Sequence, residues 1–334
     1  MIIGNPITLG GGKAPAPVGR SDVNFYDYDG SIVASYTAAD FANLSTLPKN
    51  PTHDGLTAQG WNYTLADAKT YVASYGKLDV GQMYITDDGK TRIYIRLEDG
   101  RLAPYLGIAI NGTATVEWGD GQTSTVTGSS TSTVVNTQHT YAAAGDYVIA
   151  IAVSGSMVLM GNGFNGSQVL WRNSVVMAGQ NRVYQNAIQK VEIGANTSIS
   201  TYAFAYCYSL TSVMIPSGVT SIGSSAFAYC YSLTSVMIPS GVTSISTSAF
   251  RECYSLASIT IPGSVTSIGS SAFSSCYGLG YIKFESTTPP AVASSATWTD
   301  VPTDCIIYVP RGSLSAYTSA TNYPSSSTYT YVEY

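Results

Sequence analysis

The sequence predicts a mainly β, multidomain protein with a small α+β module, a β-sandwich and a capped solenoid of stacked coils. Three observations support this fold class. The second half of the 334-residue chain repeats every 23 residues, the first half contains short strands joined by Asp-Gly turns, and 45% of the residues are hydrophobic while only 10% are charged. That composition is typical of a chain with a packed core and excludes a disordered polar chain.

The first hundred residues predict an arm followed by a small folded module. Residues 1–20 are rich in Gly, Pro and Ala, which favours a flexible or docking arm. Residues 21–100 form the predicted α+β module, with a hairpin over residues 23–36, a short helix over residues 64–74 and a second hairpin over residues 83–97. Each hairpin has an Asp-Gly pair at its centre, the strongest short-range signal for a tight turn.

The start of the chain also resembles structural proteins of tailed phages and prophages. The resemblance lies in the strings NPITLGGG (Asn5 to Gly12) and DVNFYDYDG (Asp22 to Gly30). The first residues lack a basic segment followed by an apolar stretch, so we expect no secretory signal peptide. A virion protein released by lysis needs none, and the resemblance implies attachment to a particle through the N-terminal part.

Residues 101–156 predict a β-sandwich. The strings TATVEWGDGQTSTV (Thr113 to Val126) and QHTYAAAGDYVIAIAVSG (Gln138 to Gly155) resemble the PKD-type immunoglobulin-like domain, in which a W-G-D-G turn joins two strands. The resemblance implies a spacer or adhesive domain. We expect residues 157–187 to form a connector and an irregular N-terminal cap for the repeats that follow.

The repeat is defined by three residue types that recur at a constant interval. The unit from Thr211 to Leu233 reads TSVMIPSGVTSIGSSAFAYCYSL, and the next unit is nearly identical. The positions that keep the 23-residue step are Phe204, Phe227, Phe250 and Phe273, then Cys207, Cys230, Cys253 and Cys276, then Leu210, Leu233, Leu256 and Leu279.

One unit explains its own geometry. Val213 and Ile215 alternate with polar or exposed positions, which predicts a short strand that ends at Pro216. Val219 and Ile222 form a second inward-pointing segment. The last apolar residues lie at helix-like spacing along a final arc, and they are Ala226, Phe227, Cys230 and Leu233. A single coil cannot bury these side chains, whereas coils stacked about 4.8 Å apart can, so the pattern predicts a solenoid.

This pattern resembles the BspA-type leucine-rich repeat of bacterial surface proteins. The resemblance covers residues 188–288, where the motif I-x-I-P-x-x-V-x-x-I-x-x-x-A-F-x-x-C-x-x-L recurs. Residues 289–334 contain a string, Asp304 to Tyr317, that is similar to the closing segment of such repeats. The resemblance therefore implies a C-terminal cap in which a last strand and a short helix cover the apolar end coil.

The evenly spaced cysteines have two interpretations. They could form a metal or disulfide ladder, or they could be small buried side chains that pack between coils. Cysteines on adjacent coils lie side by side, which suits a disulfide poorly, and no histidines are interleaved with them. We therefore expect buried free thiols, Cys305 included.

Composition argues against several classes of function. The formal net charge is −5, so a basic face for nucleic acid is not expected. No run of about 18 apolar residues occurs, so no membrane insertion is expected. The chain has only two histidines, His53 and His139, and no nucleophile, phosphate-loop or zinc motif. We expect no enzyme activity, no metal and no cofactor.

The repeats predict two outward stripes of candidate binding residues. One stripe follows each cysteine, where family members usually carry small or polar residues, and the other lies on the strand face. The tyrosine stripe has two interpretations of equal weight. It is either a platform that stacks on sugars or binds a protein, or a ladder that only stabilises neighbouring coils. The candidate residues are Tyr206, Tyr208, Tyr229, Tyr231, Tyr254, Tyr277, Met214 and Met237.

These observations favour non-catalytic recognition at a surface. The expected setting is a virion, as a tail fibre, receptor-binding tip or capsid-mounted fibre that recognises a cell-surface glycan or protein through the repeat face. The first alternative is a bacterial cell-surface adhesin with the same repeats, and the second is a glycan hydrolase. The oligomeric state stays open, with a homotrimer as the form that would add multivalency.

Overall fold

The computed structural model divides the chain into two compact units, residues 1–88 and residues 89–334. The structure describes residues 22–26, 32–52, 56–61, 65, 68–69, 72–73, 78–86, 88–159, 185–194 and 197–334. The predicted N-terminal arm, the helix over residues 64–74 and the connector over residues 157–187 lie wholly or largely outside these residues. The two units are described separately below.

The first unit is a four-stranded sheet with strand order β2-β1-β4-β3 and one short helix. Strands β1 and β2 pair antiparallel, so the predicted first hairpin pairing is present. Val23, Phe25 and Phe41 are fully buried, and their small core explains how so short a sheet holds together. The elements are β1 (Val23–Tyr26), β2 (Ile32–Tyr36), α1 (Ala38–Ala42), β3 (Leu56–Trp61) and β4 (Leu78–Thr86).

The second predicted hairpin, over residues 83–97, is wrong. Strand β4 pairs with β1 and β3 in the first unit, whereas β5 (Thr91–Leu97) pairs with β8 and β9 in the second. Gly89 does adopt a left-handed conformation, with φ of 71°. The Asp-Gly pair therefore marks a glycine in a turn-type conformation, as expected. The apolar face of β5 is nevertheless buried in another sheet, so pairing with distant strands decides where this strand lies.

The second unit begins with a sheet of long antiparallel strands. It orders β5, β8 (Gly145–Leu159), β6 (Tyr105–Glu117) and β7 (Thr123–Gln138) side by side. The strands bend where Gly112 and Gly155 face each other, since a Cβ on Gly112 would lie 2.0 Å from the carbonyl oxygen of Ser154. Residues 101–156 thus contribute three strands to one continuous sheet, and the PKD-like sandwich is not confirmed.

This sheet covers the first coil of the solenoid. Strand β5 pairs antiparallel with β8 on one side and with β9 (Ile188–Glu192) on the other, which joins the sheet to the repeat strands. The hydroxyls of Thr91 and Thr197 are hydrogen-bonded at 2.8 Å in the buried junction. Strands of this sheet therefore adjoin the first coil, while most of the cap predicted for residues 157–187 lies outside the described residues.

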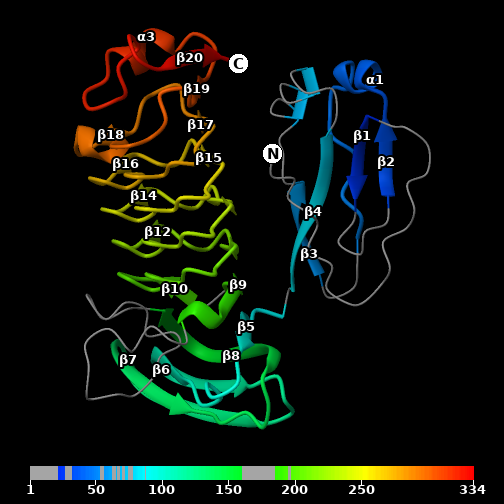
Figure 1. The fold of residues 1–334 in the computed structure, drawn as a ribbon, viewed down its shortest axis with the longest axis vertical. Helices are drawn as coiled ribbons and strands as arrows, with labels where there is room; N and C mark the ends of the chain where they lie inside the picture. The colour runs from blue at the N-terminus through cyan, green and yellow to red at the C-terminus, as the bar shows by residue number, and fades with distance from the viewer. Residues whose placement is uncertain are drawn as a thin grey trace. The chain divides into compact units, whose positions relative to one another are not determined.

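The solenoid consists of parallel strands on consecutive coils, as Figure 1 shows. The register steps by 23 residues, so Ser212 lies beside Ser235 and Ser221 beside Ser244, and the predicted stacking is confirmed. The strands are β10 (Thr197–Ile199), β11 (Ser212–Met214), β12 (Ser221–Ile222), β13 (Ser235–Val236), β14 (Ser244–Ile245), β15 (Ser258–Ile261), β16 (Ser267–Ile268), β17 (Tyr281–Phe284) and β18 (Ala291–Val292).

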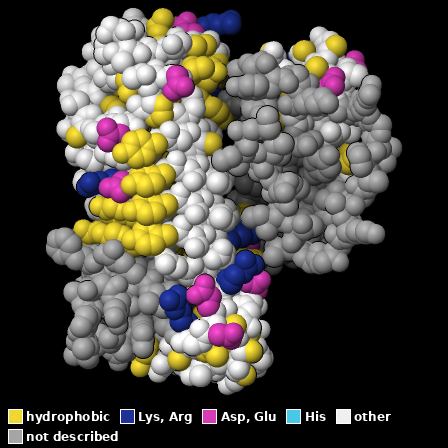
Figure 2. Space-filling view, in the orientation of Figure 1, with side chains coloured by type: hydrophobic (Ala, Val, Ile, Leu, Met, Phe, Trp, Pro, Cys, Tyr) yellow, Lys and Arg dark blue, Asp and Glu magenta, His cyan; other side chains and the backbone are white. Residues whose placement is uncertain are grey.

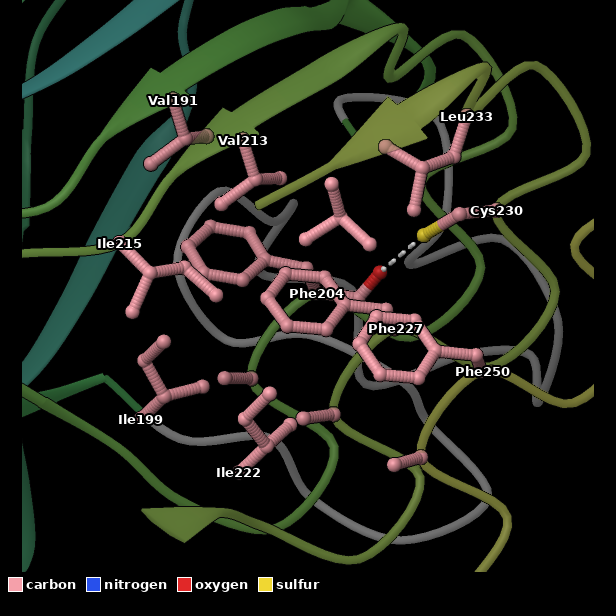
Figure 3. Close-up of a cluster of buried hydrophobic side chains, with 14 of the residues drawn as sticks. Val191, Ile199, Phe204, Val213, Ile215, Ile222, Phe227, Cys230, Leu233 and Phe250 are labelled. Atoms are coloured by element: carbon pink, nitrogen blue, oxygen red, sulfur yellow. Dashed lines mark hydrogen bonds between the residues drawn. The ribbon is translucent and has the colours of Figure 1, made fainter. Parts of the chain in front are cut away.

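A column of phenylalanine rings fills the interior of the coils. Phe204, Phe227, Phe250 and Phe273 are fully buried and stack with centroids 5.5–5.7 Å apart. Figure 3 shows the first three of these rings. Trp298 continues the column, 5.7 Å beyond Phe273. Burying one phenylalanine stabilises a fold by about 2 to 3 kcal/mol, so this column is a main source of the solenoid's stability.

The arc between the two strand faces is a series of turns. The amide N–H of Ala226 donates to Gly223 in its own coil, whereas that of Phe227 donates to Ala249 in the next coil. The following residues of the arc continue this alternation between coils. The helix-like spacing in the sequence therefore marks which side chains point inward, while half of the backbone bonds run along the solenoid axis.

The C-terminal residues close the far end of the stack. Strand β19 (Ile306–Val309) and strand β20 (Thr330–Glu333) extend the sheet of β15 and β17, and helix α3 (Leu314–Thr318) lies between them in the chain. Buried Tyr317 donates a hydrogen bond to the carbonyl oxygen of Ser286 at 2.7 Å. The cap thus buries aromatic rings and satisfies their hydroxyl groups with backbone oxygens.

Candidate functional site

Two columns of side chains run along one edge of the solenoid, where each coil passes through its arc. We call them the inner and outer columns. The inner column holds Tyr206, Tyr229, Glu252, Ser275 and Asp300, and the outer column holds Tyr208, Tyr231, Tyr254 and Tyr277. All six predicted tyrosines therefore belong to one surface, and Figure 2 shows rings gathered in rows along this edge.

The inner column is built by an unusual backbone conformation that recurs in every coil. Its five residues have φ values between 58° and 65°, the left-handed region that side chains other than glycine rarely adopt. A hydrogen bond between coils stabilises this conformation. The N–H of Tyr229 donates to the carbonyl oxygen of Arg251 at 2.8 Å, and that of Ser275 donates to the carbonyl oxygen of Thr299 at 2.7 Å. The same conformation turns the side chain outward.

The six tyrosine rings of the two columns stack along the solenoid axis, and we call them the tyrosine ladder. The centroids of Tyr206 and Tyr229 are 4.4 Å apart, and those of Tyr231 and Tyr254 are 4.5 Å apart with only 5° between the planes. In the middle of the ladder each ring face lies against the next ring, so these tyrosines expose ring edges and hydroxyl groups rather than faces. The sequence-based idea of sugars stacked on these rings therefore applies only where a face is open.

The ladder opens toward its C-terminal end. Tyr254 is 36% exposed and Tyr277 is 55% exposed, and the plane of Tyr277 is tilted 46° from that of Tyr254. The other four tyrosines are half-buried. Tyr277 is therefore the rung with a ring face available to a partner.

The predicted methionines do not belong to the ladder. Met214 is the last residue of β11 and is half-buried, whereas Met237 follows β13 and is 39% exposed. Both lie on the strand face of the coils, while the tyrosines lie on the arc. The sequence pattern placed all eight residues outside the core, but the structure brings only the tyrosines together.

Two charged residues interrupt the uncharged edge. The guanidinium group of Arg251 lies 5.8 Å from the ring centroid of Tyr229 and 3.5 Å from the carboxylate of Glu252. The Tyr254 hydroxyl donates to the other Glu252 oxygen at 2.8 Å. This hydrogen bond to an anion raises the pKa of Tyr254 above its usual value. Glu252 lies 23 residues after Tyr229, so the repeat alone could have assigned it to this edge, whereas Asp300 lies 25 residues after Ser275 and is aligned with the column only in the structure.

The cysteines lie behind the ladder and are all free and buried. The thiol of Cys230 donates to the carbonyl oxygen of Phe204 at 3.2 Å (Figure 3). Cys253 and Cys276 repeat this contact one and two coils later. Burial raises the pKa of Cys276 to about 12. Within the described residues, no three His, Cys, Asp or Glu side chains come together in a way that could hold a metal ion. The expectation of buried free thiols is confirmed.

His139 has a structural environment. Its ring stacks on Trp118 at 4.9 Å and contacts the Asp120 carboxylate at 2.7 Å, while the Tyr141 hydroxyl donates to the Trp118 carbonyl oxygen. These contacts hold the W-G-D-G turn against the sheet. His53 lies outside the described residues. Among the described residues, no helix has the length and apolar character needed to cross a bilayer.

Comparisons with known proteins agree with the repeat pattern. A family model described as a BspA type leucine rich repeat region matches residues 178–291 with six copies. No curated protein sequence matches the chain significantly.

Similar solved structures also contain leucine-rich repeats. They include the T. pallidum leucine rich repeat protein TpLRR, with 25% identity, 46% of this chain and 64% of that chain covered, and a TM-score of 0.35. The pneumococcal vaccine antigen PcpA has 14% identity, with 55% of this chain and 47% of that chain covered and a TM-score of 0.38. A leucine-rich repeat protein from Bacteroides ovatus has 25% identity, with 46% of this chain and 40% of that chain covered and a TM-score of 0.30. The chain spans less than two thirds of each of these structures. Residues 178–291, about a third of the chain, thus match a BspA-type leucine-rich repeat region.

Proposed function

We propose that this chain is a non-catalytic recognition protein displayed at a surface, and that its repeat region binds a glycan or protein through the tyrosine ladder. The observation that carries the proposal is the ordered ladder on the edge of a rigid repeat stack. Between Ser198 and Ile282, Arg251 and Glu252 are the only charged residues. Such an edge favours contacts by shape, aromatic surface and hydroxyl groups over long-range electrostatic attraction.

The stacked rings favour binding for an entropic reason. A free tyrosine loses rotamer freedom when a partner immobilises it, at a cost of about 0.5 to 1.5 kcal/mol for a flexible side chain. Rings that already stack on both sides, such as Tyr231 between Tyr208 and Tyr254, have lost that freedom before binding. Their hydroxyl groups can both donate and accept hydrogen bonds, which suits sugar hydroxyls and peptide groups.

The surface that displays the protein has two candidates. BspA-type repeats are typical of bacterial surface proteins, which favours a bacterial cell surface. The phage-like strings near the N-terminus favour a virion, with the N-terminal part as the anchor. An antibody against the repeats, used in electron microscopy of intact cells and of purified particles, distinguishes the two by which of them it labels.

The proposed binding role is tested by removing rings from the middle of the ladder. In the double variant Tyr231→Ser and Tyr254→Ser, we expect binding to bacterial cells or to an immobilised glycan array to fall at least tenfold. The control is Tyr105→Ser, which removes a tyrosine from strand β6. If the double variant folds and binds as well as the parent, the ladder serves only to stabilise the coils and the proposal is wrong.

The glycan hydrolase alternative makes a different prediction. A glycan hydrolase requires two carboxyl groups that bracket a sugar. The neighbouring carboxylates Glu98 and Asp99 lie in the turn after β5, where Glu98 forms an ion pair with Arg101 at 3.0 Å. We expect the purified protein to release no reducing sugar from cell-wall or capsular glycans. Measurable release would favour the hydrolase.

A further inference from the structure

The C-terminal end of the ladder combines an open ring face with carboxylates. Tyr277 is the last ring of the outer column, and no aromatic residue continues that column in the next coil. It has the largest exposed fraction among the exposed large hydrophobic side chains that the structure describes. An exposed phenol face carries negative electrostatic potential and attracts cations within about 6 Å of its centroid.

The inner column changes chemistry at the same end. Its first two positions are tyrosines. The next two are Glu252 in the coil of Tyr254 and Ser275 in the coil of Tyr277, and the last is Asp300 in the coil that follows. The Ser275 hydroxyl donates to the Asp300 carboxylate at 3.1 Å, which places Asp300 directly beyond Ser275 along the column. Inner and outer positions of one coil are close, as the 6.3 Å between the Tyr206 and Tyr208 centroids shows. Glu252 and Asp300 thus belong to the coils on either side of the coil that holds Ser275 and Tyr277.

The ladder already holds one guanidinium group of its own. Arg251 lies over the Tyr229 ring and against the Glu252 carboxylate, at 5.8 Å and 3.5 Å. This contact shows that a tyrosine and a carboxylate on this edge can accommodate a planar cation between them. At the end of the ladder the same two kinds of group are present, but the residue one repeat after Arg251 is the uncharged Ser274.

We propose that the C-terminal end of the ladder, formed by Tyr254, Tyr277, Glu252 and Asp300, is a docking site for an arginine side chain of a partner protein. The inference rests on the proposed binding function and names its partner class. Arginine fits better than lysine because its guanidinium group is planar, stacks on aromatic rings and gives up water more readily.

The test uses the full chain and a fluorescein-labelled peptide of alternating Gly and Arg, with binding followed by fluorescence anisotropy. The matched peptide contains citrulline, which keeps the planar shape but lacks the charge. We expect the arginine peptide to bind and the citrulline peptide to bind at least fivefold more weakly. Tyr277→Ser should weaken binding of the arginine peptide about two- to fivefold, the usual size of an exposed cation–π contact.

Matched variants separate this site from general acidity. Glu252→Gln and Asp300→Asn should each weaken binding about two- to fivefold, whereas Glu98→Gln, in the turn after β5, should leave it unchanged. Tyr277→Phe keeps the ring face and should bind like the parent. The melting temperature of each variant confirms that the fold is intact.

Three outcomes overturn the arginine site: no binding of the arginine peptide, equal binding of the citrulline peptide, or binding that none of the three site variants changes. The broader proposal is separated by the Tyr231→Ser and Tyr254→Ser variant. If that variant loses cell or glycan binding while the arginine peptide never binds, surface recognition stands and arginine docking is wrong.

Discussion

The phenylalanine column inside the solenoid and the outer tyrosine column on its edge share one 23-residue step but stack differently. The phenylalanine centroids are 5.5–5.7 Å apart, whereas Tyr208, Tyr231 and Tyr254 lie 4.5–4.7 Å apart. Coils lie about 4.8 Å apart. The tyrosine rings therefore lie flat on one another, while the phenylalanine rings are offset and also pack against their own coil. The interior column stabilises the fold, whereas the edge column is the surface that we propose for recognition.

The largest expected effect comes from breaking the interior column. Phe227→Ala removes a fully buried ring between two stacked neighbours, so we expect the free energy of unfolding to fall by about 3 to 5 kcal/mol. Urea unfolding followed by circular dichroism measures the change. Tyr231→Ala, at the matching rung of the outer column, should cost less than half as much. Equal losses for the two variants would show that the edge is part of the core.

Alkaline pH should destabilise the solenoid through its buried thiols. Burial raises the folded-state pKa of Cys276 and Cys305 to about 12, from the usual value near 9. In the unfolded chain these thiols ionise above pH 9, so the unfolded state then binds fewer protons and the free energy of unfolding falls as pH rises. The fall is about 1 kcal/mol for each thiol per pH unit between pH 9 and pH 12.

This pH dependence is measured by urea unfolding at pH 8, 9, 10 and 11. Cys276→Ala should reduce the slope above pH 9 by the share of one thiol, at the expense of a lower free energy of unfolding at pH 8. Because burial also raises the pKa of Tyr323 and Tyr331 in the C-terminal cap, the slope should steepen above pH 10. A flat profile up to pH 11 would mean that the thiols are accessible to water.

The repeat explains why so much of this comparison could be predicted from the sequence. A residue that recurs at one coil length must occupy the same place in every coil, so Cys230 and Phe227 had to form internal columns. The same argument placed Tyr231 and its equivalents on one outward line. It required no knowledge of the arc's backbone, because position along the repeat is enough to align side chains.

The rest depended on contacts that sequence distance hides. Strand β5 follows an Asp-Gly turn, yet it pairs with β9 almost a hundred residues later, so a local turn signal could not place it. Tyr206 and Tyr229 adopt a left-handed conformation that propensity gives to glycine or asparagine, and only the hydrogen bond between coils stabilises it there. The coverage of ring faces by neighbouring rings likewise became visible only in three dimensions.

A smaller effect is expected from coupling within the ladder. In a double-mutant cycle of Tyr231→Ala and Tyr254→Ala, the loss for the pair should differ from the sum of the single losses by about 0.5 to 1 kcal/mol, because each ring stacks on the other at 4.5 Å. The matched control cycle pairs Tyr231→Ala with Tyr105→Ala, a tyrosine of β6, and should show additive losses. Additivity in both cycles would mean that the stacking does not stabilise the coils.

The smallest expected effect concerns the ion pair on the edge. Arg251 is partly exposed, its side chain retaining 44% of its accessible surface, and it lies 3.5 Å from Glu252, so Arg251→Ala should lower the free energy of unfolding by only about 0.5 kcal/mol. Part of that loss is electrostatic and should shrink in 0.5 M salt, while the part due to packing on Tyr229 should persist. Arg251→Lys keeps the charge but loses the planar contact, so it should retain only the salt-sensitive part. A loss well above 1 kcal/mol would place Arg251 among the residues that hold the coils together and remove it as a model for how the ladder accepts a partner's arginine.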